Sequence, residues 1–267
     1  PKLVEIPMQQ HIGACCEVLV NKGDYVYVGQ VLGDTEKFVS APIHSSVSGK
    51  VTQIKDITLY NGAKSVSIVI ETDGNQNLLP GISKPDIATK EKFLKAVRSS
   101  GLTGLGGAGF PAHIKLDTKE KIPEALIVNA VECEPYITCD YRAIIEEGNE
   151  IVKGVKLILE KLSIPKAYIA LEDNKPEAFN LLKELVKQDA RIEVVMLATK
   201  YPQGAEKMLI YALTGREVPM NGLPIDIGVV VMNVTSVLAL FKYCETGIPL
   251  VSRRLTVDGS GVMEKGN

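Results

Sequence analysis

Between residues 89 and 248 the sequence alternates short apolar runs with amphipathic segments. Runs rich in Val, Ile, Leu and Ala predict four strands, at Ala125–Ala130, Lys166–Leu171, Ile192–Leu197 and Ile227–Met232. Segments with helical spacing follow them, at Ala143–Leu162, Pro176–Gln188, Ala205–Leu213 and Thr235–Cys244. Strands that are largely apolar and alternate with helices predict an α/β fold, with a mainly parallel sheet and helices on both faces.

A different pattern fills residues 1–75. The apolar stretches between Val18 and Val51 are short, and turn phrases rich in Gly, Lys and Asp separate them. One more strand is predicted at Ser67–Glu71. This punctuation predicts a small domain of β-hairpins. Residues 76–88 contain several Pro and Gly residues without a clear period, which predicts a linker before the α/β region of residues 89–248.

The segment Gly101–Lys115 is unusually rich in glycine, with five glycines among its first nine residues. Glycines let the backbone take positive φ and let its N–H groups approach a ligand closely, so the segment suits a phosphate or a flat ring. The preceding residues, Glu91–Ser100, have helical spacing, and Gly101 is a natural end for that helix. A dinucleotide-binding Gly-x-Gly-x-x-Gly string normally follows a strand, so an ordinary Rossmann site is not expected.

Polar residues lie where three of the predicted strands end. Ligands of parallel sheets bind at the carboxyl ends of the strands, so these positions are candidates for a binding site. Asn233 directly precedes a predicted helix and could also serve as its N-cap. The candidates are Asn129, Glu132 and Glu134 after the first strand, Tyr201 and Glu206 after the third, and Asn233 after the fourth.

Composition narrows the classes of function. The chain has 267 residues, enough for two domains, and a net charge of −2, which gives no reason to expect a nucleic-acid partner. No apolar run approaches the length of a membrane helix and no signal peptide is apparent, so any membrane association is expected to come through partners. The five cysteines form no Cys-x-x-Cys pair, so no zinc or iron-sulfur site is expected within this sequence.

Two motifs together resemble a known family. The glycine segment and Val128–Pro135 (Val-Asn-Ala-Val-Glu-Cys-Glu-Pro) resemble the flavin-binding core shared by respiratory complex I, in its flavin subunit, and by the NADH- and flavin-binding subunit of the Rnf electron-transport complex. The string Glu-Cys-Glu-Pro-Tyr-Ile-Thr-Cys-Asp looks like the Rnf protein, and the segment from Tyr201 resembles the family's Tyr-x-x-Gly-Glu-Glu. Residues 1–75 resemble the barrel-sandwich hybrid of biotinyl and lipoyl domains, and residues 249–267 resemble the opening strands of a β-grasp domain.

The resemblance implies roles for individual residues. Backbone N–H groups of Gly104 and Gly106, with the cation of Lys115, would hold FMN and its phosphate, and Gly107 would leave space over the flavin ring. Phe110 would stack on the adenine of the nucleotide. Asn129 and Asn233 match asparagines that contact the flavin, Glu134 and Glu206 match residues that face NADH, and Glu132 and Tyr201 complete the set. Three positions depart from complex I: Leu105 replaces an arginine, Val131 an aspartate and Ala205 a glutamate.

The function implied is an electron-transfer oxidoreductase that takes a hydride from NADH onto FMN. No catalytic acid or base is expected, because the protein supplies alignment and exclusion of water. The resemblance also implies two 4Fe–4S clusters in a region absent from this sequence, other Rnf subunits as partners, and ferredoxin indirectly. It implies a peripheral position on the cytoplasmic side of the membrane in an ion-translocating complex. The sequence is then expected to be a fragment of a longer protein.

Three alternatives stay open at this point. A soluble relative could feed a cytosolic reductase. A non-catalytic scaffold with an empty flavin site would explain Leu105, Val131 and Ala205. A biotin or lipoyl carrier would use Lys37, although the Met-Lys-Met motif of such carriers is missing.

Overall fold

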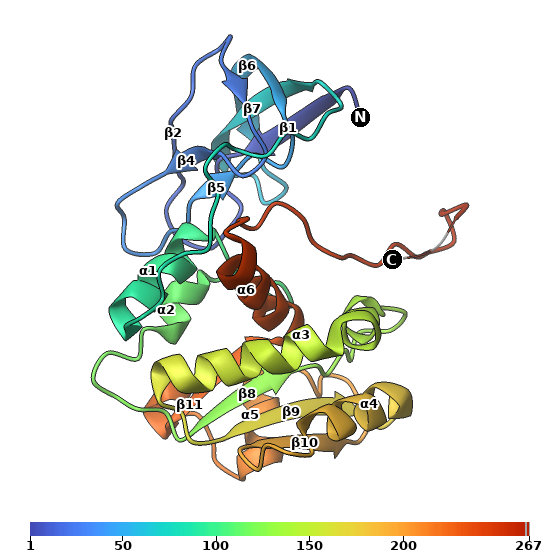
Figure 1. The fold of residues 1–267 in the computed structure, drawn as a ribbon. Helices are drawn as coiled ribbons and strands as arrows, with labels where there is room; N and C mark the ends of the chain where they lie inside the picture. The colour runs from blue at the N-terminus through green and yellow to red at the C-terminus, as the bar shows by residue number, and fades with distance from the viewer. Residues whose placement is uncertain (265, 267) are drawn as a thin grey trace. The chain divides into compact units, whose positions relative to one another are not determined.

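A computed structural model describes residues 1–264 and residue 266. The contacts within the chain divide it into two compact units, drawn in Figure 1. The first unit contains Pro1–Lys115 and Lys242–Arg253, and the second contains Leu116–Phe241 and the described residues from Arg254 onward. The glycine segment Gly101–Lys115 therefore belongs to the same unit as the N-terminal β domain.

The N-terminal part of the first unit consists of two small antiparallel sheets around one core. One sheet has the order β1-β7-β6-β3, formed by Leu3–Pro7, Lys64–Thr72, Gly49–Thr58 and Tyr25–Val26. The other has the order β2-β4-β5, formed by Glu17–Val18, Val31–Asp34 and Ile43–His44. Alternate residues of these strands point inward, and Met8, Leu32, Val51, Ile68 and Ile70 are completely buried between the sheets. The predicted barrel-sandwich architecture is confirmed.

The rest of the first unit carries the glycine segment. Helix α1 (Lys90–Ser99) begins at Thr89, whose side chain accepts a hydrogen bond from Lys92 N at 3.3 Å. It ends as predicted, because Gly101 takes a left-handed φ of 68° and its N–H bonds the Arg98 carbonyl. A short helix that the sequence pattern does not indicate, α2 (Ala112–Leu116), follows the glycines. Residues 76–88 form no helix or strand beyond an isolated bridge between Val28 and Leu78.

The second unit contains the parallel sheet. Its order is β10-β9-β8-β11, formed by Ile192–Leu197, Ala167–Glu172, Ala125–Asn129 and Val229–Asn233, and all three pairings are parallel. The helices are α3 (Cys139–Leu162), α4 (Pro176–Val186), α5 (Glu206–Thr214) and α6 (Val234–Thr246), with a 3-10 turn at Pro224–Ile227. The four predicted strands and four predicted helices are confirmed, with ends that differ by a few residues.

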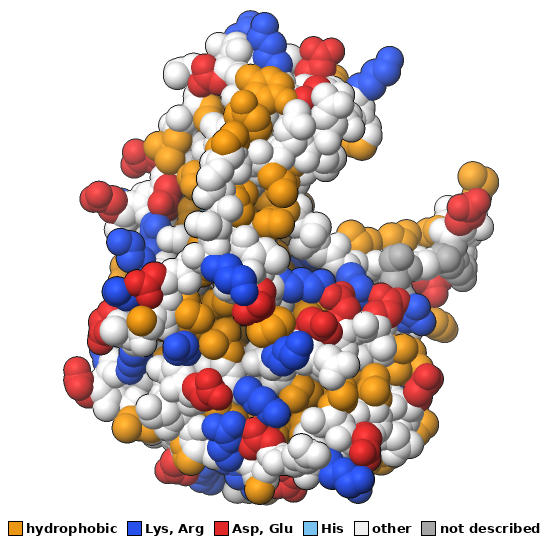
Figure 2. All heavy atoms as spheres, in the orientation of Figure 1, with side chains coloured by type: hydrophobic (Ala, Val, Ile, Leu, Met, Phe, Trp, Pro, Cys, Tyr) orange, Lys and Arg blue, Asp and Glu red, His pale blue; other side chains and the backbone are white. Residues whose placement is uncertain are grey.

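Helices cover both faces of this sheet, as the apolar strands predict. Leu209 and Ile210 of α5 pack in one core cluster with Ile127 and Val231. Successive side chains of a strand point to opposite faces, so the equally buried Leu126 faces the other side. Figure 1 shows α3 crossing that other face. On the face of the second unit drawn in Figure 2, acidic and basic side chains are interspersed, without a large area of one sign.

The C-terminal residues differ from the prediction. No strand forms among the described residues after Pro249, and only an isolated bridge joins Val257 to Gly266. The start of a β-grasp domain therefore stays a prediction. Among the described residues, no helix is long and apolar enough to cross a membrane.

Candidate functional site

The glycine segment forms a closed loop in the first unit. Thr103 pairs with Pro111 in a bridge, and Ala112 N donates to Leu102 O at 2.9 Å. The Gly104 N–H donates to Phe110 O at 2.9 Å, so this amide is engaged inside the loop and not directed at a phosphate, as the sequence analysis expects. Gly104 therefore closes the base of the loop.

The tip of the loop is the part that can meet a ligand. Gly106, Gly107 and Ala108 are exposed, whereas Phe110 and Lys115 are half-buried. A Cβ placed on Gly107 would meet no atom within 4 Å. The space beside Gly107 is therefore open, as a flat ring lying over the loop requires.

The barrel of the first unit supports both ends of this loop. At its start, a Cβ on Gly101 would lie 2.6 Å from Pro42 O and 2.8 Å from His44 Nδ1, so only glycine fits. His44 is buried, and burial lowers its pKa to about 4, so this contact is made by a neutral imidazole. At the end of the loop, Ile12 N donates to Gly109 O at 3.2 Å.

An ion pair fastens α1 to the same barrel. Arg98 donates to both Asp34 carboxylate oxygens, at 3.0 and 2.7 Å, and to Thr35 O at 2.9 Å. Partial burial acts to raise the pKa of Asp34, but the hydrogen bonds from Arg98 and the Thr35 amide hold it below its usual value. Helix α1 leads directly into the glycine loop, so this pair fixes where the loop begins.

Replacing Asp34 with asparagine is expected to loosen the glycine loop without unfolding the barrel. Loss of the half-buried charge pair should increase hydrogen exchange at the Gly104 and Ala112 amides about fivefold. Exchange measured by mass spectrometry over peptides covering residues 101–112 tests this. The matched control is Lys55→Met, which removes the Lys55–Glu5 pair (2.9 Å) of the barrel. Equal exchange in both variants and the wild type would show that the pair does not hold the loop.

The other predicted residues lie at the carboxyl edge of the sheet in the second unit. Asn129 ends β8, and its Nδ2 donates to Gly204 O at 2.8 Å while its Oδ1 accepts from Val131 N at 3.0 Å. Its amide therefore ties together the loops that follow β8 and β10. The Gly204 N–H also donates to Cys133 Sγ at 3.3 Å.

Glu132 has a structural role that its sequence position does not reveal. Its side chain is 8% exposed and accepts hydrogen bonds from Asp140 N at 2.8 Å and Tyr141 N at 3.2 Å. These are amides of the first turn of α3, and a carboxylate is favourable at the positive end of a helix. Thr138 is the N-cap residue by position but makes no side-chain capping bond. Glu132 thus caps α3, and both of its oxygens are engaged by the protein.

Asn233 is the N-cap that the sequence analysis names as one of its two possible roles. Its Oδ1 accepts from Thr235 N at 2.9 Å and Ser236 N at 3.3 Å, at the start of α6. Its Nδ2 donates to Asp140 Oδ2 at 2.7 Å. Asp140, which the sequence analysis does not single out, therefore connects Asn233 to the start of α3. A flavin contact of Asn233 stays a prediction.

Glu132, Cys139 and Asp140 place their ligand atoms within 4.8 Å of one another, the spacing of a metal site. Burial, and then the negative charges of Asp140 and Glu132, raise the pKa of Cys139 to about 11. The thiol is therefore protonated at neutral pH, and a metal binds the thiolate. Since both carboxylates already accept bonds from α3 and Asn233, the cluster is explained as a helix cap.

The remaining candidates face solvent or the surface. Glu134 is exposed, Tyr201 is 71% exposed, and Glu206 is partly buried in the first turn of α5. Gln203, which the sequence analysis does not propose, is buried in the same loop. The structure thus joins Asn129, Glu132 and Asn233 into one hydrogen-bonded edge and leaves Glu134 and Tyr201 accessible beside it.

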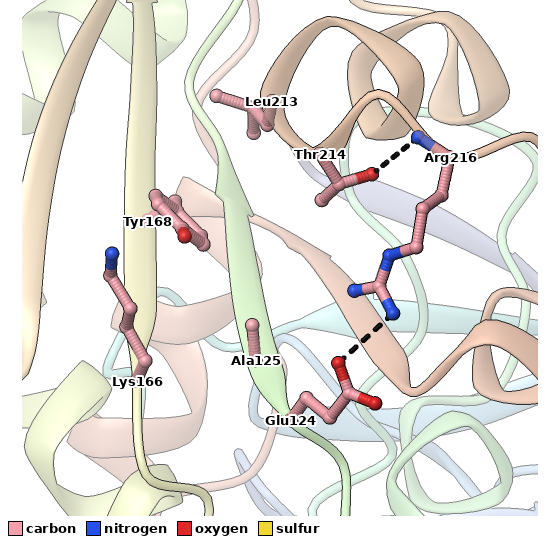
Figure 3. Close-up of a pocket in the computed structure, with 7 residues that line it drawn as sticks. All are labelled: Glu124, Ala125, Lys166, Tyr168, Leu213, Thr214 and Arg216. Atoms are coloured by element: carbon pink, nitrogen blue, oxygen red, sulfur yellow. Dashed lines mark hydrogen bonds and ion pairs between the residues drawn. The ribbon is translucent and has the colours of Figure 1, made fainter.

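A pocket of about 270 Å³ lies elsewhere in the second unit, at the amino ends of β8 and β9 (Figure 3). Its charged groups are paired: Arg216 with Glu124 at 2.9 Å, and Lys166 with Glu193 at 2.9 Å. Lys166 also lies 4.3 Å from the centre of the Tyr168 ring. Parallel sheets bind ligands at the opposite edge, so this pocket is not the candidate site.

Two family models match the chain. The model of the RnfC barrel sandwich hybrid domain matches residues 1–75, and the model of the Nuo51 FMN-binding domain matches residues 97–242. The second match contains every predicted site residue, from Gly104 to Asn233.

Similar proteins agree with these models. The RnfC-type subunit of the proton-translocating ferredoxin:NAD(+) oxidoreductase complex of Clostridium ljungdahlii is 44% identical over 272 residues, covering 100% of this chain and 59% of that protein. Its counterpart in the Na(+)-translocating ferredoxin:NAD(+) oxidoreductase complex of Acetobacterium woodii is 43% identical over 267 residues, covering 98% of this chain and 60% of that protein. The chain thus spans about 60% of the length of these curated relatives.

A solved structure also shares the fold. The NAD+-reducing NiFe-hydrogenase in its air-oxidized state matches with a TM-score of 0.53 and 26% identity, over 60% of this chain and 31% of that chain. The family resemblance drawn from the glycine and Glu-Cys-Glu-Pro motifs is confirmed. The chain belongs to the RnfC family of ion-translocating oxidoreductase complexes, and its α/β region is related to the FMN-binding domain of the complex I flavin protein.

Proposed function

We propose that this chain is the FMN- and NADH-binding module of an Rnf-type complex. The observation that carries the proposal is the glycine loop with its open, exposed tip, inside the segment that matches an FMN-binding domain. Bound FMN would supply the exchange between a two-electron hydride donor and one-electron iron-sulfur acceptors. The relatives' names support NAD(+) and ferredoxin as the partners of the whole complex.

The chain's own residues would bind and orient the ligands. The tip at Gly106 and Gly107 would lie against the flat flavin ring, and Lys115 would provide a positive charge for its phosphate. Glu134, Tyr201 and Glu206 would face the nicotinamide nucleotide from the carboxyl edge of the sheet. Asn129, Glu132 and Asn233 would act mainly by holding that edge in shape, because the protein already engages their polar atoms.

The rest of the pathway is proposed from the family. Electrons would leave one at a time to 4Fe–4S clusters outside this chain and pass through other Rnf subunits. Those subunits would also hold the chain on the cytoplasmic side of the membrane.

The test of the proposal is flavin binding followed by reduction. The purified chain, mixed with FMN and desalted, should retain a flavin absorption spectrum, and NADH should bleach it under anaerobic conditions. In Gly107→Val, the dissociation constant for FMN should rise at least tenfold, ~1.4 kcal/mol. The fold should be unaffected, because a Cβ at Gly107 meets no protein atom within 4 Å.

The control is Gly261→Val, since Gly261 is equally open and lies far along the chain from the loop. Equal FMN affinity in Gly107→Val and the wild type would show that the ring does not lie over the loop tip. A wild-type chain that retains no flavin would favour the scaffold. The engaged side chains of Asn129, Glu132 and Asn233 are the observation on which that second candidate rests.

A further inference from the structure

A segment remote in sequence lies along the glycine loop within the first unit. Leu250 N donates to Ser100 O at 2.8 Å, at the base of the loop. Three residues later, Arg253 Nη2 donates to Leu105 O at 2.9 Å, in the tip between Gly104 and Gly106. The backbone anchor at Leu250 and the side-chain bond at Leu105 together fix the Arg253 guanidinium beside the exposed tip.

The charges at this place favour an anion. Residues 101–116 contain no Asp or Glu, and Lys115 adds a positive charge. Within the part of the chain that the structure describes, Arg253 forms no ion pair, and its side chain is exposed. A guanidinium carries five N–H donors, and the bond to Leu105 uses one of them. The neighbouring Arg254 is different, because Glu146 and Glu147 each pair with it at 2.7 Å.

We propose that Arg253 binds a phosphate group of the ligand held at the glycine loop. The inference rests on the proposed function and adds a residue that the motifs do not contain. A planar guanidinium bonds two phosphate oxygens at once, and its anchoring by Leu105 means that little side-chain freedom is lost on binding. The phosphate could belong to FMN or to the diphosphate of NADH, and both present the same chemistry to Arg253.

Comparing FMN with riboflavin, which lacks the phosphate, separates the two sources. In Arg253→Gln, the dissociation constant for FMN should rise about tenfold while that for riboflavin changes less than about twofold. Arg253→Lys should recover only part of the loss, because an ammonium cannot bond two oxygens in parallel. Arg254→Gln is the matched control and should leave the ratio of FMN to riboflavin affinity unchanged. Flavin fluorescence titration and NADH-dependent flavin reduction provide both readouts.

Each outcome decides one question. Loss of the preference for FMN assigns the FMN phosphate to Arg253. Unchanged flavin affinities with a KM for NADH raised about tenfold assign the nucleotide diphosphate instead. Unchanged FMN affinity, riboflavin affinity and KM overturn the inference while the proposed function stands. A wild-type chain that binds neither flavin nor NADH overturns the proposed function, and the inference fails with it.

Discussion

Replacing Glu132 with alanine is expected to lower the free energy of unfolding by about 3 kcal/mol, because hydrogen bonds to a buried carboxylate contribute about 1.5–3 kcal/mol each. Two such bonds are lost, from Asp140 N and Tyr141 N, and the positive end of α3 loses its counter-charge. Relief of repulsion between Glu132 and Asp140 offsets part of the loss. Urea denaturation of the chain without ligands measures the change.

Two further variants separate a structural role from a ligand contact. Glu134→Ala removes an exposed carboxylate from the same loop and should change stability by less than about 0.5 kcal/mol. Glu132→Gln keeps an acceptor but removes the charge, so its stability should fall between those of the wild type and Glu132→Ala. It should also lower the pKa of Cys139 from about 11, measured as thiol reactivity against pH, because Glu132 is one of the charges that raise it.

Wild-type stability in Glu132→Ala, together with a raised KM for NADH, would contradict the cap. Glu132 would then be a nucleotide contact, as the family motif implies. The two roles therefore predict opposite patterns of stability and kinetics for one substitution.

The strands could be predicted from the sequence because parallel strands buried on both faces are apolar throughout. Strand β10 has the predicted bounds, and the other three differ by one or two residues at an end. The start of α3 could not be predicted, because its cap is the side chain of Glu132, seven residues before Cys139, and no local capping motif marks it. Helix α2 was missed for a similar reason, since it begins directly after glycines and Pro111, which usually indicate a turn.

The candidate site was predictable as a set of positions but not as a set of contacts. The motif identifies Asn129, Glu132 and Asn233, and the rule for parallel sheets places them at one edge. Their hydrogen bonds depend on Gly204 and Asp140, which lie on other segments and have no distinctive spacing. The support of the glycine loop by the barrel depends equally on remote pairs such as Arg98 with Asp34. Contacts of this kind require the coordinates.

Replacing Gly204 with valine is expected to reduce kcat/KM for NADH-dependent flavin reduction by about 100-fold, the size of effect that follows when reacting groups are displaced by about 1 Å. A Cβ on Gly204 would lie 2.5 Å from Val131 O and 3.3 Å from Cys133 Sγ. Backbone cannot give way as a side chain can, so the loop after β10 must move away from the end of β8. The bond from Asn129 Nδ2 to Gly204 O, at 2.8 Å, would then break.

The size of the effect depends on the loop that Gly204 holds. That loop carries Tyr201 and leads into Glu206, the residues proposed to face the nucleotide, so its displacement should raise KM as well as lower kcat. Ala205→Ser is the matched control, because Ala205 is the next residue, is exposed, and tolerates a small polar group. Gly204→Val should also destabilise the chain by about 1–3 kcal/mol through overpacking, so activity must be compared at a temperature where both variants are folded. A folded Gly204→Val with wild-type kcat/KM would mean that hydride transfer does not depend on where this loop lies, and the nucleotide would have to bind elsewhere.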